Sequence, residues 1–123
     1  MSMITGVVVG HGVLAAALID AVARIAGADN GLVPISNTDC DRGTLESRIT
    51  DAVGEGPAVV FIDMPSGSCM FAAMHRLRDM PGMRVVTGVN LAMLLEFVFH
   101  RDGALDEVAA RVADAGTTAI GIR

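Results

Sequence analysis

The chain of 123 residues contains no tryptophan, no tyrosine and no lysine, and only four phenylalanines. The four phenylalanines sit in or beside apolar runs, so the chain has no platform on which nucleotide bases can stack. Its nine basic residues are all arginine and are scattered, and the formal net charge is −5. Binding to phosphate backbones needs a clustered basic surface. We therefore predict no nucleic-acid partner.

Disulfides and membrane spans are also disfavoured. Cys40 and Cys69 are the only cysteines, too few for a disulfide framework or a zinc site. They follow two strands that flank a central one, so we expect a separation of about 10 Å, which disfavours a disulfide. No uninterrupted apolar run approaches the ~20 residues of a membrane span, and no signal-peptide pattern opens the sequence. We expect a protein of the reducing cytoplasm.

Apolar stretches rich in Val and Ile alternate with helical patterns along the chain. The predicted strands cover 3–10, 32–35, 58–62, 83–87 and a short last stretch, 117–122. Two helices are predicted over 12–26 and 68–78. Between them, a helix is capped by Asp41 or Thr44 and ended by Gly54. Two more follow: one begins after Asn90 and stops before Gly103, and the last is marked by Leu105, Val108 and Val112. This alternation favours a mostly parallel sheet with helices on both faces. We predict a flavodoxin-like, doubly wound α/β fold with strand order 2-1-3-4, in a single domain over residues 1–123.

One histidine stands where the first strand ends. His11 lies between Gly10 and Gly12, which remove side-chain obstacles around the imidazole and allow a sharp turn. The third strand stops at Asp63. In the predicted order these two strands are neighbours, so their carboxyl ends bring both side chains to the crevice where open α/β sheets bind ligands. A polar residue at the end of a buried strand must be solvated or paired, which favours a contact between His11 and Asp63.

Such a pair suits a nucleophilic histidine. When one ring nitrogen donates its proton to the aspartate, the other keeps a free lone pair for attack. Gly12 leaves room for the in-line approach of a bulky phosphoryl donor. Ser66, Gly67 and Ser68 lie where the next helix begins, and free backbone N–H groups there suit an anion. Together these features suggest phosphoryl transfer through His11.

Each of these residues also has a structural interpretation. His11 can be a loop histidine, Asp63 a cap of the following turn, and the two serines ordinary turn and N-cap residues. We expect His75 on a solvated helix face, and His100 at a helix end, where it complements the dipole.

A dinucleotide site is a second alternative. Gly10-x-Gly12-x-x-Ala15 follows a strand and satisfies the G-x-G-x-x-G/A fingerprint. That fingerprint also requires an acidic residue at the end of the second strand. The chain has Ile35-Ser36-Asn37-Thr38 there, with no acidic residue. It leaves the pair of His11 and Asp63 without a role, so we give phosphoryl transfer the preference.

Three segments, taken in order, carry a family pattern. They are Gly10-His11-Gly12, then Asp63 with Ser66-Gly67-Ser68, and most specifically Val86-Thr87-Gly88-Val89-Asn90-Leu91-Ala92-Met93-Leu94-Leu95-Glu96, with its G-V-N-x-x-M-L-x-E core. Together they resemble the EIIA domain of the mannose-type (mannose/fructose/sorbose) phosphoenolpyruvate-dependent sugar phosphotransferase system. The resemblance covers nearly the whole chain. It departs at Met64-Pro65-Ser66, where family members commonly carry an aromatic residue and a second glycine.

The resemblance implies that His11 accepts a phosphoryl group from the phosphohistidine of HPr and passes it to a histidine of an EIIB partner. It implies that Asp63 hydrogen-bonds His11 and that Ser68 lies near the phosphoryl group. No metal or organic cofactor is implied, because the donor is a protein. The family is also homodimeric, and the resemblance implies that strand 117–122 can be exchanged between subunits, which would complete a sheet edge.

Two related functions stay open beside this one. The sequence ends at Arg123 and we expect no fused EIIB domain, so the protein can serve a stand-alone regulatory phosphorelay without a sugar permease. The phosphocarrier subunit of dihydroxyacetone kinase shares the histidine after strand one, but the G-V-N-x-x-M-L-x-E stretch favours the mannose-type branch. Our prediction is a cytoplasmic EIIA phosphocarrier that acts through His11 and Asp63.

Overall fold

The computed structural model describes residues 3–123, and in this part of the chain four parallel strands form one sheet in the order β2-β1-β3-β4. The strands are β1 (Thr5–Gly10), β2 (Leu32–Ser36), β3 (Ala58–Ile62) and β4 (Met83–Thr87). The predicted parallel sheet and strand order are confirmed. In the register of the central pair, Val9 lies opposite Ile62. The residues that follow β1 and β3 therefore emerge side by side.

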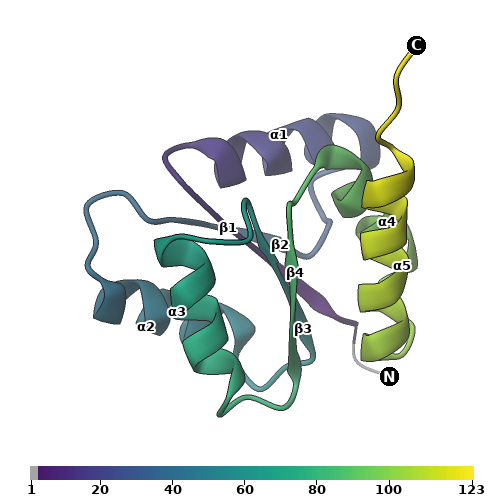
Figure 1. Cartoon of the computed structure of the whole chain (residues 1–123). Helices are drawn as coiled ribbons and strands as arrows, with labels where there is room; N and C mark the ends of the chain where they lie inside the picture. The colour runs from purple at the N-terminus through teal and green to yellow at the C-terminus, as the bar shows by residue number, and fades with distance from the viewer. Residues whose placement is uncertain (1–2) are drawn as a thin grey trace.

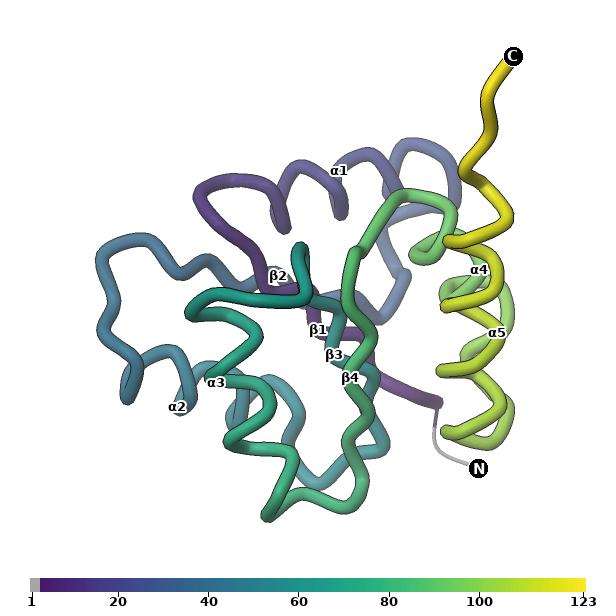
Figure 2. Tube along the Cα trace, in the orientation of Figure 1, coloured from purple at the N-terminus to yellow at the C-terminus, as the bar shows by residue number. Residues whose placement is uncertain are grey.

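Five helices of the described chain cover the sheet on both faces (Figure 1). They are α1 (Leu14–Ala26), α2 (Arg42–Val53), α3 (Ser68–Leu77), α4 (Leu91–His100) and α5 (Leu105–Thr118). α2 and α3 lie on one face, and α1, α4 and α5 lie on the other. The connections that follow β1, β2 and β3 all lie at the same end of the sheet (Figure 2). Across residues 3–123, no helix combines the length and the apolar character needed to cross a membrane.

The side chains of the two central strands alternate between two cores. Val7 and Val60 pack with α2 and α3, whereas Val8 and Phe61 pack with the other three helices. Phe61 meets Phe97 of α4 edge to face, with ring centroids 5.4 Å apart. All five residues of β3 are fully buried, which explains its unbroken apolar sequence. The outer strand β2 differs, because its Pro34 has no N–H group and sits at the edge of the sheet.

The prediction of a last strand over residues 117–122 is wrong for the chain taken by itself. α5 continues through the first two of these residues, and the Thr117 hydroxyl donates a hydrogen bond to the carbonyl of Ala113 at 3.1 Å. Beyond the helix, Ile120 and Ile122 are 77% and 96% exposed, and the segment extends away from the body of the molecule (Figure 1). Neither isoleucine finds apolar surface in the same chain, so nothing favours a strand here.

Two predicted helix caps are present. Asp41, rather than Thr44, caps α2 by accepting the N–H of Thr44 at 2.8 Å. Asn90 caps α4 by accepting the N–H of Met93 at 3.0 Å, and its amide also donates to the carbonyl of Gly116 in α5 at 3.2 Å. The two helices meet closely there, because a Cβ added to Gly116 would lie 2.4 Å from the Met93 methyl group. Asn90 therefore joins the start of α4 to the end of α5.

We predict that Asn90→Ala lowers the free energy of unfolding by about 1 to 2 kcal/mol, because it removes a helix cap together with an interhelical hydrogen bond. Urea denaturation measures the change. Asn90→Ser is the matched control, since its hydroxyl can still cap α4 but cannot reach Gly116, and its stability should lie between those of the other two proteins. Equal stability of Asn90→Ala and the unchanged protein would contradict both roles.

Candidate functional site

The carboxyl ends of β1 and β3 bring His11 and Asp63 into direct contact. Nδ1 of the imidazole lies 2.7 Å from Oδ2 of Asp63, and the backbone N–H of His11 donates to the same oxygen at 3.0 Å. The Asp63 side chain is only 9% exposed, whereas that of His11 is 45% exposed. Because a carboxylate only accepts, a neutral His11 carries its proton on Nδ1 and keeps a lone pair on Nε2.

Asp63 is held in its charged form. Burial raises the pKa of its carboxyl group, but hydrogen bonds from the imidazole and the backbone N–H of His11 outweigh burial, so the pKa lies below its ordinary value. The other oxygen, Oδ1, is buried and has no hydrogen-bond partner among residues 3–123. The carboxylate can thus offset positive charge that develops on the imidazole.

The outer side of the imidazole faces the beginning of α3. Gly67 precedes the helix with φ +92°, and a Cβ added there would lie 3.8 Å from Cε1 and 3.9 Å from Nε2 of His11. A residue with a side chain would be strained at this φ, and its Cβ would be in van der Waals contact with the ring. No side chain of the described residues caps this end of α3. Its first N–H groups are therefore free to bind an anion.

Gly12 follows the histidine directly, and Ser68 follows Gly67, which faces the ring. Gly12 has φ +58° and open space where a Cβ would point, so the approach to the ring is clear from that side. Ser68 is the first residue of α3, and its hydroxyl oxygen accepts a hydrogen bond from the Asn37 amide at 3.3 Å. Its own hydroxyl hydrogen therefore remains available to a bound anion.

Two residues at the end of β2 belong to the site although the sequence analysis did not select them. The Asn37 backbone N–H donates to the Gly10 carbonyl at 3.2 Å, and the Ser36 hydroxyl donates to the Gly12 carbonyl at 2.7 Å. They fix the loop that presents the histidine. The predicted strand order, which places β2 beside β1, is the signal in the sequence that points to them.

Ser66 lies in the loop before α3, and His75 and His100 have charged partners of their own. Ser66 is exposed and lines a neighbouring groove of about 560 Å³. His75 pairs with Glu46 of α2, and His100 lies 3.4 Å from Glu96 within α4. The structural interpretations of these two histidines agree with their positions.

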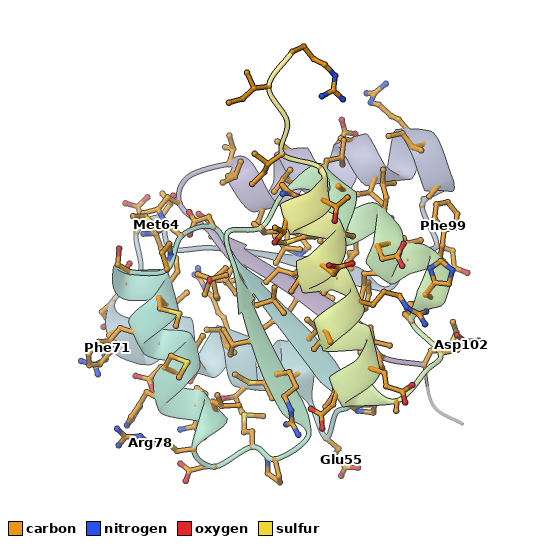
Figure 3. All side chains as sticks on the ribbon, turned by 45° about the vertical axis from the view of Figure 1, so that its right-hand side comes forward. Glu55, Met64, Phe71, Arg78, Phe99 and Asp102 are labelled. Carbon is orange, nitrogen blue, oxygen red and sulfur yellow. The ribbon has the colours of Figure 1, made fainter. Side chains whose placement is uncertain are left out.

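The neighbouring groove is apolar and is bordered by positive charge. Phe71 and Met74 of α3 are 56% and 42% exposed, and the Arg42 guanidinium stacks 3.6 Å above the Phe71 ring. Arg78 also lines the groove. Figure 3 shows Phe71 and Arg78 on the side of the molecule formed by α2 and α3, with Phe99 on the opposite side. The groove therefore gives the surface beside His11 an exposed apolar character.

One further side chain with metal-binding chemistry lies at the pair. Cys69 is fully buried, and its Sγ, one ring nitrogen of His11 and one carboxylate oxygen of Asp63 lie within 4.8 Å of one another. Burial and the charge of Asp63 raise the pKa of the Cys69 thiol. Cys40 is partly buried, and both cysteines are free thiols.

The dinucleotide alternative finds little support in this geometry. In that type of site, backbone N–H groups of the glycine-rich turn approach a pyrophosphate. Here the N–H of His11, inside Gly10-x-Gly12, is directed to Asp63 instead. The glycines of the turn thus serve the histidine pair.

Comparison with known proteins identifies relatives of this chain. The family model EIIA-man matches residues 5–114. It is described as the PTS system fructose IIA component, where PTS stands for the sugar phosphotransferase system. The mannose/sorbose-specific IIA subunit from Enterococcus faecalis is 25% identical with a TM-score of 0.86, and the match covers 99% of this chain and 96% of that one. The EIIA component from Streptococcus agalactiae is 21% identical with a TM-score of 0.91 over 98% and 97% of the two chains.

A third solved structure extends the likeness in fold. The PTS IIA protein associated with the fucose utilization operon of Streptococcus pneumoniae is 19% identical, with a TM-score of 0.75 over 94% of this chain and 93% of that one. A search of curated protein sequences gives no match. Because the family model spans most of the sequence, the chain belongs to the EIIA-man family of PTS IIA components.

Proposed function

We propose that this chain is a phosphocarrier whose His11 accepts a phosphoryl group from HPr and passes it to an EIIB partner. One observation carries the proposal: Asp63 holds Nδ1 of the imidazole, while Nε2 faces the uncapped beginning of α3. Membership of the EIIA-man family supports a role in the phosphotransferase system. The particular donor and acceptor follow from the resemblance to that family.

In the forward step, the Nε2 lone pair of His11 attacks the phosphorus of the donor phosphohistidine. The new N–P bond forms as the N–P bond of the donor breaks, and the donor histidine leaves with its electron pair. Asp63 keeps the ring in the attacking tautomer and offsets the charge that the ring acquires. In the second step an acceptor nitrogen attacks the same phosphorus, and the lone pair returns to Nε2.

The phosphoryl oxygens are expected at the beginning of α3. The free N–H groups after Gly67 and the positive end of the helix dipole favour their negative charge. The Ser68 hydroxyl can donate to one oxygen while it accepts from Asn37. Gly12 leaves the line of approach open, and Ser66 completes the loop that borders this position.

The groove beside His11 supports a protein, rather than a small molecule, as phosphoryl donor. Exposed apolar side chains such as Phe71 and Met74 line this groove, which also includes Gly67, the residue that faces Nε2. Surfaces of this kind are typical of protein interaction sites. We propose that HPr contacts Phe71 when it delivers the phosphoryl group.

The remaining features of the proposal concern assembly and location. We propose a homodimer that works in the cytoplasm, where the other components of the relay are found. The exposed Ile120 and Ile122 give a second copy an apolar segment to cover. An exchanged C-terminal strand stays a prediction, which a structure of the assembled protein would test.

We predict that His11→Ala abolishes phosphorylation without loss of the fold. After incubation with phosphoenolpyruvate, Enzyme I and HPr, intact-mass spectrometry should show one added phosphoryl group per chain, lost in acid, and none in His11→Ala. His75→Ala and His100→Ala are matched controls and should be labelled normally, because both histidines lie outside the site. A folded His11→Ala protein that still gains the group would refute the assignment.

We predict that Phe71→Ala slows labelling by HPr about tenfold, a size typical of a buried contact residue, and leaves labelling by phosphoramidate unchanged. The small donor needs no docking surface, so it separates docking from chemistry. Phe99→Ala is the matched control, since Phe99 is 63% exposed on the opposite side of the molecule (Figure 3). Equal labelling rates with HPr for the two variants would argue against docking at the groove.

We predict that Asp63→Asn slows labelling and removes about 1 to 3 kcal/mol of stability near neutral pH. The folded pKa of Asp63 is lowered, so its stabilisation is present above the unfolded pKa, about 4, and is lost as the pH falls through the folded value. The difference in unfolding free energy between the two proteins should therefore shrink in acid. A difference independent of pH would show that the charge of Asp63 is not involved.

A further inference from the structure

We propose that His11, Asp63 and Cys69 form a binding site for a thiophilic divalent cation, of which Zn²⁺ fits best, and that the bound metal prevents phosphorylation of His11. The metal site stands on its own geometry, and its effect on the relay rests on the proposed function. A ring nitrogen, a carboxylate oxygen and a sulfur lie within 4.8 Å of one another. Imidazole, carboxylate and thiolate are the donor groups that zinc uses in proteins.

The three donors come from three different elements. His11 follows β1, Asp63 follows β3, and Cys69 is the second residue of α3. Cys69 is fully buried, so its sulfur is held beneath the pair instead of in solvent. The sequence alone does not predict this metal site, because the other two donors, an imidazole and a carboxylate, come from segments far from Cys69 in the chain.

An independent observation points to a cation. Oδ1 of Asp63 is buried and has no hydrogen-bond partner among the described residues, although its side chain is only 9% exposed. A buried, charged oxygen without a partner is costly. The two hydrogen bonds from His11 both go to Oδ2, so they leave Oδ1 unsatisfied. A metal ion that also contacts Oδ1 would satisfy it.

The cluster is close to the size that zinc requires. Tetrahedral zinc holds N, O and S donors at about 2.0 to 2.3 Å, which places the donors roughly 3.3 to 3.8 Å apart. Nδ1 and Oδ2 are 2.7 Å apart and must separate a little. The donors that lie farther apart are within 4.8 Å of one another and must approach by about 1 Å at most, a shift that side-chain rotations can supply. His11 is 45% exposed, which gives the ion a path from solvent and room for a water ligand.

Metal binding and phosphorylation require opposite tautomers of His11. The metal binds the lone pair of Nδ1, so the ring proton, which lies on Nδ1 when His11 donates a hydrogen bond to Asp63, lies on Nε2 instead. The Cys69 thiol releases its proton to solvent as the S–metal bond forms. Nε2 then has no lone pair with which to attack phosphorus. The metal and the phosphoryl group therefore compete for one imidazole.

The metal site is tested with the whole reduced chain and Co²⁺ as the probe, without any phosphoryl donor. We expect one Co²⁺ per chain, a near-ultraviolet thiolate-to-cobalt charge-transfer band, and loss of that band when Zn²⁺ is added. Cys69→Ala and Cys69→Ser, each shown to be folded by its thermal transition, should lack the band and bind Zn²⁺ at least about tenfold more weakly. Cys40→Ala is the matched control and should keep the band. A band that is missing from the unchanged chain, or that survives in both Cys69 variants, overturns the site.

The competition is tested by the ratio of phosphoramidate labelling rates with and without Zn²⁺. This donor keeps any effect of zinc on Enzyme I or HPr out of the measurement. We expect at least a tenfold slower rate with Zn²⁺ for the unchanged chain, and a ratio near one for Cys69→Ala. The same ratio in both proteins overturns the competition. No labelling of His11 even without metal overturns the proposed function and the competition together, while the cobalt band still decides the metal site.

Discussion

A carboxylate at the end of a fully buried strand must be neutralised or hydrogen-bonded, and this constraint organises the site. β3 buries all five of its side chains and delivers Asp63 to the rim of the sheet. At the end of the neighbouring strand β1, His11 donates hydrogen bonds from its ring and from its backbone N–H to Oδ2 of Asp63. The pairing that relieves Asp63 also sets the tautomer of the imidazole. The stability of Asp63 and the reactivity that we propose for His11 therefore depend on the same contact.

The two faces of the sheet have different tasks. On the face covered by α1, α4 and α5, Asn90 joins two helices, and Phe61 packs edge to face against Phe97. The face covered by α2 and α3 carries the apolar groove, with Phe71 exposed and the uncapped beginning of α3 next to the histidine. The exposed apolar surface and the free N–H groups thus lie on the same side of the molecule as α2 and α3.

The sequence was sufficient wherever local pattern and strand order determine position. The unbroken apolar run of β3 predicted a strand buried on both faces, and the alternation of elements predicted the neighbours that bring His11 to Asp63. The sequence was insufficient where a contact depends on the direction in which a side chain points. Nothing in the spacing shows that Cys69 turns toward the pair. The strand predicted over 117–122 failed for a different reason, since its isoleucines have no surface to cover within one chain.

The edges of the sheet limit how copies of this chain can associate. Pro34 removes a donor from the edge strand β2, which disfavours the addition of another strand on that side. The opposite edge, β4, contains no proline. Two copies that meet through their β4 edges would leave only β2 edges facing outward. Growth of the sheet would stop at that point, so association through strands closes on itself and does not extend into a fibre.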